Sequence, residues 1–286
     1  MRTRLRWRWW LTALVSIAAG LVSGPAGAQR FIPDDLLALP ALISVSGTAL
    51  GSGFFIGSAK ATYLITARHV VYDAGGALLP SVRVTAFAVE SNDPTKFVID
   101  VNLAALFRDD RLARDTARDV VVVQVGLVFD HPTDKSLQRI EWQPGVNSVS
   151  MPARGYLSAP MEKLRPFEEV LVSNQIVLFG YPATVGLPQI GKQFDYDRPL
   201  LRAGIVAGKY KAQRTIILDA SVHGGNSGGP VLQVEQDGRG RHFSIIGVVT
   251  QWIPAVLQGT NTVAHSGYSV AASVDPIKTL IVELEK

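Results

Sequence analysis

The chain has 286 residues, of which 47% are hydrophobic and 18% are charged, and it contains no cysteine. This length can bury one large hydrophobic core or two smaller ones, and the lack of cysteine excludes disulfide bonds, thiolate catalysis and cysteine-ligated metals. Four arginines among the first eight residues account for the net charge of +4, because without them 24 basic residues face 24 acidic residues. The rest of the chain is neutral, which argues against binding to nucleic acid or to acidic membranes.

The first 28 residues have the three regions of a secretory signal peptide. The arginine-rich start precedes an apolar run of 14 residues, Trp9–Val22, and the small-residue cleavage motif Ala26-Gly27-Ala28. A membrane anchor is the alternative, but a spanning helix needs about 20 apolar residues. We predict cleavage after Ala28 and export to the periplasm or the medium, with no stable membrane association, leaving residues 29–286 as one domain.

After this leader, short apolar runs rich in Val and Ile dominate the chain and are separated by Gly, Pro and Asn. Runs of this length and spacing are typical of strands in an all-β sandwich or barrel. We expect strands at Leu42–Val45, Gly53–Ile56, Thr62–Thr66, Val82–Val89, Val120–Val125, Gln175–Phe179, Ile205–Ala207, Thr215–Leu218, Val231–Val234, Ser244–Thr250 and Tyr268–Ala271.

His69 lies just after the second of two successive predicted strands. The first strand lies in the glycine-rich run Gly51–Gly57, and the second is Thr62–Thr66. Because histidine has a near-neutral pKa, it can accept a proton and return it during catalysis. His69 is therefore the candidate general base, with an ordinary, partly buried histidine as the alternative. His223 lies four residues before Ser227, where it can line a substrate cleft.

Two segments fit the strand pattern poorly. Residues 108–118 carry mixed charge, which is typical of a solvated loop or a short helix. Residues 131–166 contain five prolines, which favours an irregular connection between two halves of the fold.

Asp119 stands between the charged segment and the apolar run Val120–Val125. A carboxylate can orient a catalytic imidazole and stabilise its protonated form. Asp119 is the candidate for this role, and a solvated aspartate is the alternative. It is the one aspartate here that adjoins an apolar strand able to bury it, unlike the competitors Asp109, Asp110 and Asp115.

The stretch Asp219–Pro230 places Ser227 among four glycines. A serine hydroxyl is a poor nucleophile unless a base takes its proton, and the oxyanion that forms needs N–H donors. Glycines allow the sharp turns that bring backbone amides close to a bound carbonyl group. Ser227 is the candidate nucleophile, and a glycine-rich hairpin turn is the alternative.

The C-terminal segment has the one convincing helical pattern of the chain. Asp275 can cap a helix and Pro276 suits its first turn. Apolar residues follow at the spacing of a single buried face, namely Ile277, Leu280, Ile281 and Leu284.

Together, these motifs resemble the trypsin-like (chymotrypsin-fold) serine proteases, and in motif they are most similar to the bacterial HtrA/Deg-like branch. The matching features are Gly51-Ser-Gly-Phe, Thr66-Ala-Arg-His-Val, Asp119 before its strand, and Gly225-Asn-Ser-Gly-Gly-Pro, in the order His, Asp, Ser. The resemblance extends from about Ala41 to the C-terminus. It implies an all-β fold with two antiparallel β-barrels, at about 41–150 and about 166–286, and a C-terminal α-helix.

The resemblance also assigns roles to residues around the nucleophile. It implies an oxyanion hole formed by the amides of Gly225 and Ser227. A strand at Thr250, Gln251 and Trp252 would pair with an extended substrate peptide. No metal or organic cofactor is implied, and the expected partner is a polypeptide substrate.

The resemblance implies that Ser221 lies at the base of the primary specificity pocket. An uncharged residue there argues against cleavage after Arg or Lys. Val249 replaces the histidine that glutamate-specific relatives carry, which argues against that preference as well. We therefore expect small or medium apolar side chains in the pocket.

Three features depart from the family pattern. Asn226 replaces the aspartate with which digestive zymogens bind a newly freed N-terminus, so we expect no activation by that route. The chain has no room for a PDZ domain after its terminal helix, and Arg68 replaces the usual small residue beside the base.

The sequence as a whole predicts an exported serine endopeptidase. The alternatives are a catalytically silent pseudoprotease that binds peptides or proteins and, less favoured by the order of the triad, an esterase-like acyl hydrolase.

Overall fold

The computed structural model describes residues 32–88, 95–130, 138–152, 155–181, 198–238, 240–256, 259 and 263–286. Residues Asp34–Lys286 form one compact unit. The predicted signal peptide and its cleavage site lie outside the described residues. No helix in the described part of the chain is long and apolar enough to cross a membrane.

The first half of the compact unit is a ten-stranded sheet in the order β6-β7-β3-β2-β1-β4-β5-β9, with β8 paired to β7 and β10 paired to β2. All pairs are antiparallel except β10 with β2. Alternate apolar residues from these strands meet in one buried cluster, with Phe55 and Phe97 in edge-to-face contact. The strands are β1 (Pro40–Val45), β2 (Thr48–Gly57), β3 (Ala61–Ala67), β4 (Val82–Ala86), β5 (Phe97–Val101), β6 (Leu112–Asp115), β7 (Val120–Asp130), β8 (Gln138–Trp142), β9 (Val146–Ser150) and β10 (Ser158–Pro160).

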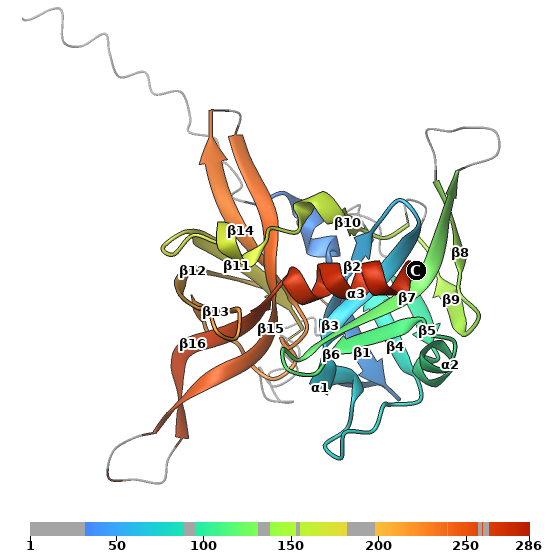
Figure 1. Ribbon diagram of the computed structural model, residues 1–286, viewed down its shortest axis with the longest axis horizontal. Helices are drawn as coiled ribbons and strands as arrows, with labels where there is room; N and C mark the ends of the chain where they lie inside the picture. Colours follow the sequence, from blue (N-terminus) through green and yellow to red (C-terminus); the bar gives the residue numbers. More distant parts are fainter. Residues whose placement is uncertain are drawn as a thin grey trace, which may run out of the picture. The chain divides into compact units, whose positions relative to one another are not determined.

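The second half is a closed barrel in the order β11-β12-β13-β16-β15-β14. Its core is a separate apolar cluster that includes Val206, Leu218 and Val231. In Figure 1, β15 and β16 continue beyond the barrel as a long two-stranded ribbon. The strands are β11 (Gln175–Gly180), β12 (Leu200–Tyr210), β13 (Thr215–Asp219), β14 (Pro230–Asp237), β15 (Gly240–Val256) and β16 (Val263–Ser273).

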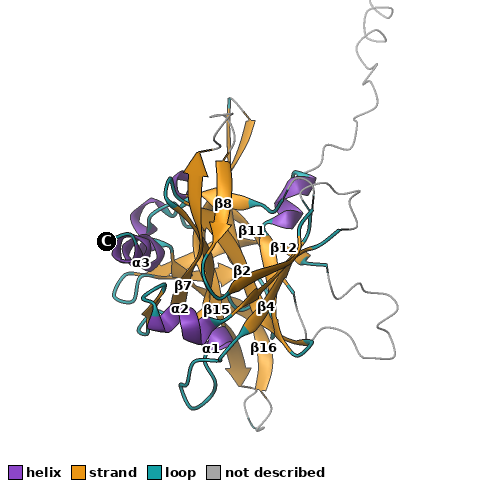
Figure 2. Ribbon diagram, turned by 90° about the vertical axis from the view of Figure 1, so that its right-hand side faces the viewer, coloured by secondary structure: helices purple, strands orange, loops and turns teal. Residues whose placement is uncertain are grey.

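Helices are short and few among the described residues, as Figure 2 shows. The longest is α3 (Asp275–Leu284), which follows the last strand of the barrel and packs on β6 and β7 of the first sheet. The others are α1 (Arg68–Val71), α2 (Leu103–Arg108), η1 (Asp34–Ala38), η2 (Met161–Lys163) and η3 (Phe167–Glu169).

Just beyond α3, Glu285 fastens the C-terminus to the first sheet. Its Oε1 accepts hydrogen bonds from the hydroxyls of Ser58, at 2.6 Å, and Tyr63, at 2.9 Å. Burial acts to raise the pKa of Glu285, but the hydrogen bonds from Ser58 and Tyr63 and the charge of Lys60 outweigh it, so the pKa is lowered. The ionised carboxylate therefore stabilises the contact between the terminal segment and the sheet.

The all-β prediction is confirmed, and each predicted strand overlaps an observed one. Three local expectations were wrong. Residues 108–118 include the edge strand β6, whose Leu112 is buried against β7, although the surrounding charge concealed it. Residues 131–166 contain β8, β9 and β10, because Pro144 and Pro152 lie between these strands and Pro160 lies at the end of β10. Helix α3 begins at Asp275, so Val274 is its N-cap, and the Asp275 carboxylate instead accepts a hydrogen bond from Arg214 at 2.9 Å.

Candidate active site

His69 and Asp119 are in direct contact. Helix α1 starts immediately after β3, and its second residue is His69. The ring Nδ1 of His69 lies 2.6 Å from Oδ2 of Asp119, and the backbone N–H of His69 donates to Oδ1 of the same carboxylate at 3.0 Å. A carboxylate only accepts hydrogen bonds, so Nδ1 carries the proton and Nε2 is left with a lone pair. This is the tautomer that a general base requires.

The backbone around Asp119 keeps this contact in place. Asp119 has a φ of +58°, a conformation that aspartate tolerates better than most residues. Its carbonyl oxygen accepts a hydrogen bond from the N–H of Arg68 at 2.9 Å. The carboxylate is not buried as the sequence suggested, since its side chain is 29% exposed. Two competing candidates are occupied elsewhere, because Asp115 pairs with Arg118 and Asp109 pairs with Arg108.

The loop that carries Ser227 is held against the strands that lead to His69. The N–H of Ser52 on β2 donates to the carbonyl oxygen of Ser227 at 2.7 Å. Gly228 has a φ of +86°, and a Cβ at this position would overlap backbone and side-chain atoms of Ser52 and Thr66. The structure thus brings the Ser227 loop close to the C-terminal end of β3, where α1 begins. The Ser227 hydroxyl makes no hydrogen bond to a described residue, a frequent state in a site without substrate.

The backbone amides of the loop alternate between paired and unpaired. The N–H groups of Asn226, Gly228 and Gly229 donate to the carbonyl oxygens of His223, Val249 and Asn226 at 3.0, 2.7 and 3.0 Å. Those of Gly225 and Ser227 donate to no described residue. Residues 223–226 form a turn whose third residue, Gly225, has a φ of +98°, as a type II turn requires. The two amides expected to form the oxyanion hole are therefore available to a ligand.

Ser52 organises this loop, although the sequence did not single it out. Its buried hydroxyl donates to the carbonyl oxygen of Gly225 at 2.7 Å and accepts the N–H of Tyr181 at 2.9 Å. Asn226 is fully buried, and its Oδ1 accepts the N–H of His223 at 3.1 Å. The Gly51-Ser-Gly spacing was the available signal for Ser52, because a small polar residue between glycines suits a close backbone approach.

The strand expected to bind substrate has an open edge. Pairing of β14 with β15 ends at Val248, opposite Pro230, while β15 stays paired to β16 up to Val256. Gln251 and Trp252 are exposed. Thr250 donates its hydroxyl to the carbonyl oxygen of Val270 at 3.3 Å. The far edge of β15 beyond Val249 therefore has no strand partner among the described residues and can accept an extended peptide.

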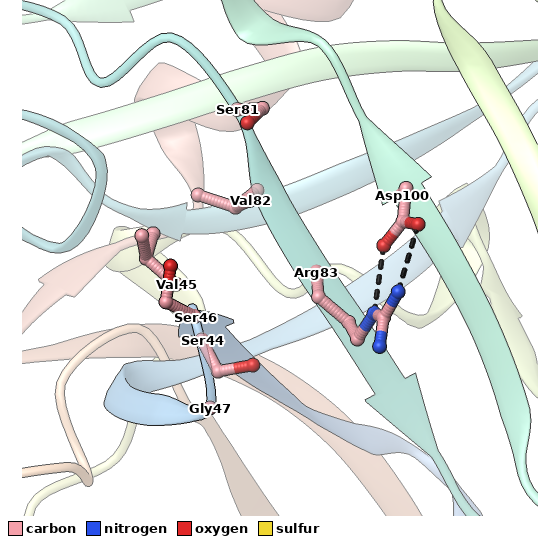
Figure 3. Close-up of a pocket in the computed structure, with 8 residues that line it drawn as sticks. All are labelled: Ser44, Val45, Ser46, Gly47, Ser81, Val82, Arg83 and Asp100. Atoms are coloured by element: carbon pink, nitrogen blue, oxygen red, sulfur yellow. Dashed lines mark hydrogen bonds and ion pairs between the residues drawn. The ribbon is translucent and has the colours of Figure 1, made fainter.

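A separate cavity of about 440 Å³ lies in the first sheet and is shown in Figure 3. None of the predicted site residues lines it. Its two charged side chains, Arg83 and Asp100, form two hydrogen bonds to each other at 2.7 and 2.9 Å, so each charge is already paired with the other. Within the described part of the chain, no group of three or more His, Asp or Glu side chains is placed to hold a metal ion.

A family model for the trypsin-like peptidase domain matches residues 51–240, well over half of the chain. The chain belongs to the trypsin-like peptidase family. The match spans the positions of His69, Asp119 and Ser227. Membership in this family supports a serine-protease-type function with polypeptide substrates.

Several solved structures are similar to this chain at low sequence identity. Human heparin binding protein superposes with a TM-score of 0.53 at 11% identity, covering 89% of this chain and 94% of that one. Deg5 has a TM-score of 0.47 at 16% identity over 86% and 88% of the two chains. A serine endoprotease from Yersinia pestis has a TM-score of 0.45 at 15% identity over 89% and 68%. No curated protein sequence matches. The likeness to human heparin binding protein confirms the chymotrypsin fold, and an identity of 11% carries no statement about activity.

Proposed function

We propose that this trypsin-like peptidase is an exported serine endopeptidase in which Ser227, His69 and Asp119 form a catalytic triad. The observation that carries the proposal is the pattern of free groups around Ser227. The amides of Gly225 and Ser227 have no partner among the described residues, while those of Asn226, Gly228 and Gly229 are paired. The adjacent imidazole is held by Asp119 with its Nε2 lone pair free.

These groups can perform peptide hydrolysis in two steps. Nε2 of His69 takes the hydroxyl proton of Ser227 while Oγ attacks the carbonyl carbon of the substrate. The carbonyl oxygen becomes an oxyanion, which the N–H groups of Gly225 and Ser227 stabilise. His69 then gives its proton to the leaving amine, and an acyl-enzyme remains. Water, deprotonated by His69, attacks the ester and releases the carboxylic acid and the free Ser227 hydroxyl.

The open edge of β15 supports an extended substrate. A peptide that pairs with Thr250–Trp252 as an added strand presents its scissile carbonyl toward the neighbouring Ser227 loop, because Val249 is bonded to that loop through Gly228 and Gly229. Export is part of the proposal and rests on the leader sequence alone. N-terminal sequencing of the protein recovered from the periplasm or medium should begin at Gln29.

Hydrolysis of a fluorogenic casein by the mature protein tests the activity. We expect turnover by the wild type and a loss of about 10³-fold or more in kcat/KM for Ser227→Ala and for His69→Gln. Ser148→Ala is the matched control, since it removes an exposed serine hydroxyl on β9, outside the candidate site. A binding module without catalysis is the second candidate, favoured by the missing Ser227–His69 hydrogen bond. Casein binding by a folded wild type that shows no turnover would support that candidate and contradict the triad.

A further inference from the structure

An arginine without a partner among the described residues faces the end of the barrel that carries Ser227. Ile205 of β12 pairs with Asp219, the last residue of β13, so Leu200–Gly204 extends past β13 toward the loop that follows it. We call this end of the barrel the mouth. Gly204 faces inward there, because exposure alternates along β12 and Gly204 belongs to the less exposed set. Strand side chains alternate, so Arg202 shares this inward face with Gly204 and the buried Val206.

Arg202 makes neither a hydrogen bond nor an ion pair with a described residue, and its Nε is buried without a partner. Burying part of a guanidinium in this way is unfavourable unless an anion meets it. Arginine also presents a fork of donors that matches a carboxylate. The side chain is thus arranged for an anionic group that comes from outside the described residues.

His223 is the second free donor at the mouth. Neither nitrogen of its ring forms a hydrogen bond to a described residue. Burial lowers the pKa of His223, and the electrostatic effects of Arg202 and His265 lower it further. No carboxylate among the described residues counteracts them. Among the described residues, the charges that act on this imidazole are therefore positive.

His265 and Trp252 form a wall beside His223. The rings of His223 and His265 have centroids 5.3 Å apart, and His265 stacks on Trp252 with centroids 5.4 Å apart. Nδ1 of His265 accepts the N–H of Gly267 at 3.1 Å, and Nε2 donates to the carbonyl oxygen of Val222 at 2.6 Å. Both nitrogens of His265 are engaged in hydrogen bonds, so its ring is held in place as a wall, and His223 is the imidazole whose ring nitrogens bond to no described residue.

We infer that Arg202 and His223 form a pocket at the barrel mouth for an acidic side chain of the substrate, the Asp or Glu immediately before the scissile bond. The pocket lies between the Ser227 loop, which contributes His223, and the open edge of β15, which contributes Trp252. The inference rests on the proposed peptidase function and names its substrate class. It replaces the apolar preference expected from Ser221 and Val249, because the cation comes from β12, far from those residues in the sequence.

Two substrates that differ only in charge test the pocket. The acetyl-Ala-Ala-Ala-Glu and acetyl-Ala-Ala-Ala-Gln p-nitroanilides have side chains of nearly equal size. We expect kcat/KM for the Glu substrate to exceed that for Gln by about 10- to 100-fold, as a charge-assisted hydrogen bond provides. Arg202→Met should bring the ratio near one. Lys211→Met, which removes a cation from the turn at the opposite end of the β12–β13 hairpin, should leave it unchanged.

Equal rates for Glu and Gln in the wild type, or faster cleavage of the corresponding Leu substrate, would overturn the pocket without any variant being needed. Calorimetric binding of the acetyl-Ala-Ala-Ala-Glu and -Gln amides to Ser227→Ala separates the pocket from catalysis. Tighter binding of the Glu peptide by a protein whose wild type is inactive would support the pocket and contradict the peptidase. An active wild type with no preference in either assay would contradict the pocket alone.

Discussion

Removing the Ser52 hydroxyl should weaken both the fold and the site, because this one group joins the two halves of the protein at the Ser227 loop. In Ser52→Ala, the carbonyl oxygen of Gly225 and the N–H of Tyr181 lose their buried partner. An unsatisfied buried group costs about 1–3 kcal/mol, so the free energy of unfolding should fall by about 2–6 kcal/mol. The freed Gly225 peptide should also lose its fixed orientation.

The folded Ser52→Ala protein should also lose activity, since loss of an oriented oxyanion donor costs about 10²–10³-fold in kcat. Urea unfolding and the rate of peptide hydrolysis below the unfolding transition measure the two effects separately. Ser44→Ala is the control, because Ser44 is a buried serine of the same sheet whose hydroxyl bonds to no described residue. A Ser52→Ala protein as stable and as active as Ser44→Ala would refute the role of Ser52.

Three further predictions follow from single contacts. Gly228→Ala should prevent folding or activity because its Cβ overlaps the neighbouring strand, whereas Gly76→Ala, with a similar φ of +80° and open space, should cost only the strain of about 1–2 kcal/mol in thermal unfolding. Glu285→Gln should have a lower free energy of unfolding than the wild type at pH 7. Because the pKa of Glu285 is lowered on folding, this difference in stability should disappear as the pH falls below about 4 and the carboxylate becomes protonated. The ratio of kcat/KM for the Glu substrate to that for the Gln substrate should rise as the pH falls from 8 to 6, because protonation of His223 adds positive charge to the pocket and a bound carboxylate raises the lowered pKa of this histidine. His69 acts on both substrates equally, so it does not change the ratio. In His223→Gln the ratio should stay constant over this pH range.

The elements with strong local patterns were predictable from the sequence. Long apolar strands such as Val120–Asp130 and the buried face of α3 depend on periodicity within one segment. His69 and Asp119 were found because each adjoins such a strand. Short edge strands such as β6 were missed, because only Leu112 of its residues is buried and pairing with β7 supplies the rest of its stability.

The surroundings of the site depend on contacts between distant parts of the chain. Ser52 and Gly225 are 173 residues apart, and His265 reaches Val222 across 43 residues. Nothing near Arg202 in the sequence indicates that it faces the barrel mouth, since this follows from the register of β12 with β13. Local patterns therefore located the candidate catalytic residues, while the pocket that would select a substrate became visible in the fold.

The most direct test of the proposed triad is the reaction of the purified mature protein with a fluorophosphonate probe, followed by intact-mass analysis. An activated serine attacks the phosphorus centre, so the wild type should gain the mass of one phosphonyl group. Ser148→Ala should react equally, and Ser227→Ala should remain unmodified. An unmodified but folded wild type, or a Ser227→Ala protein that still reacts, would contradict the assignment of Ser227 as the nucleophile.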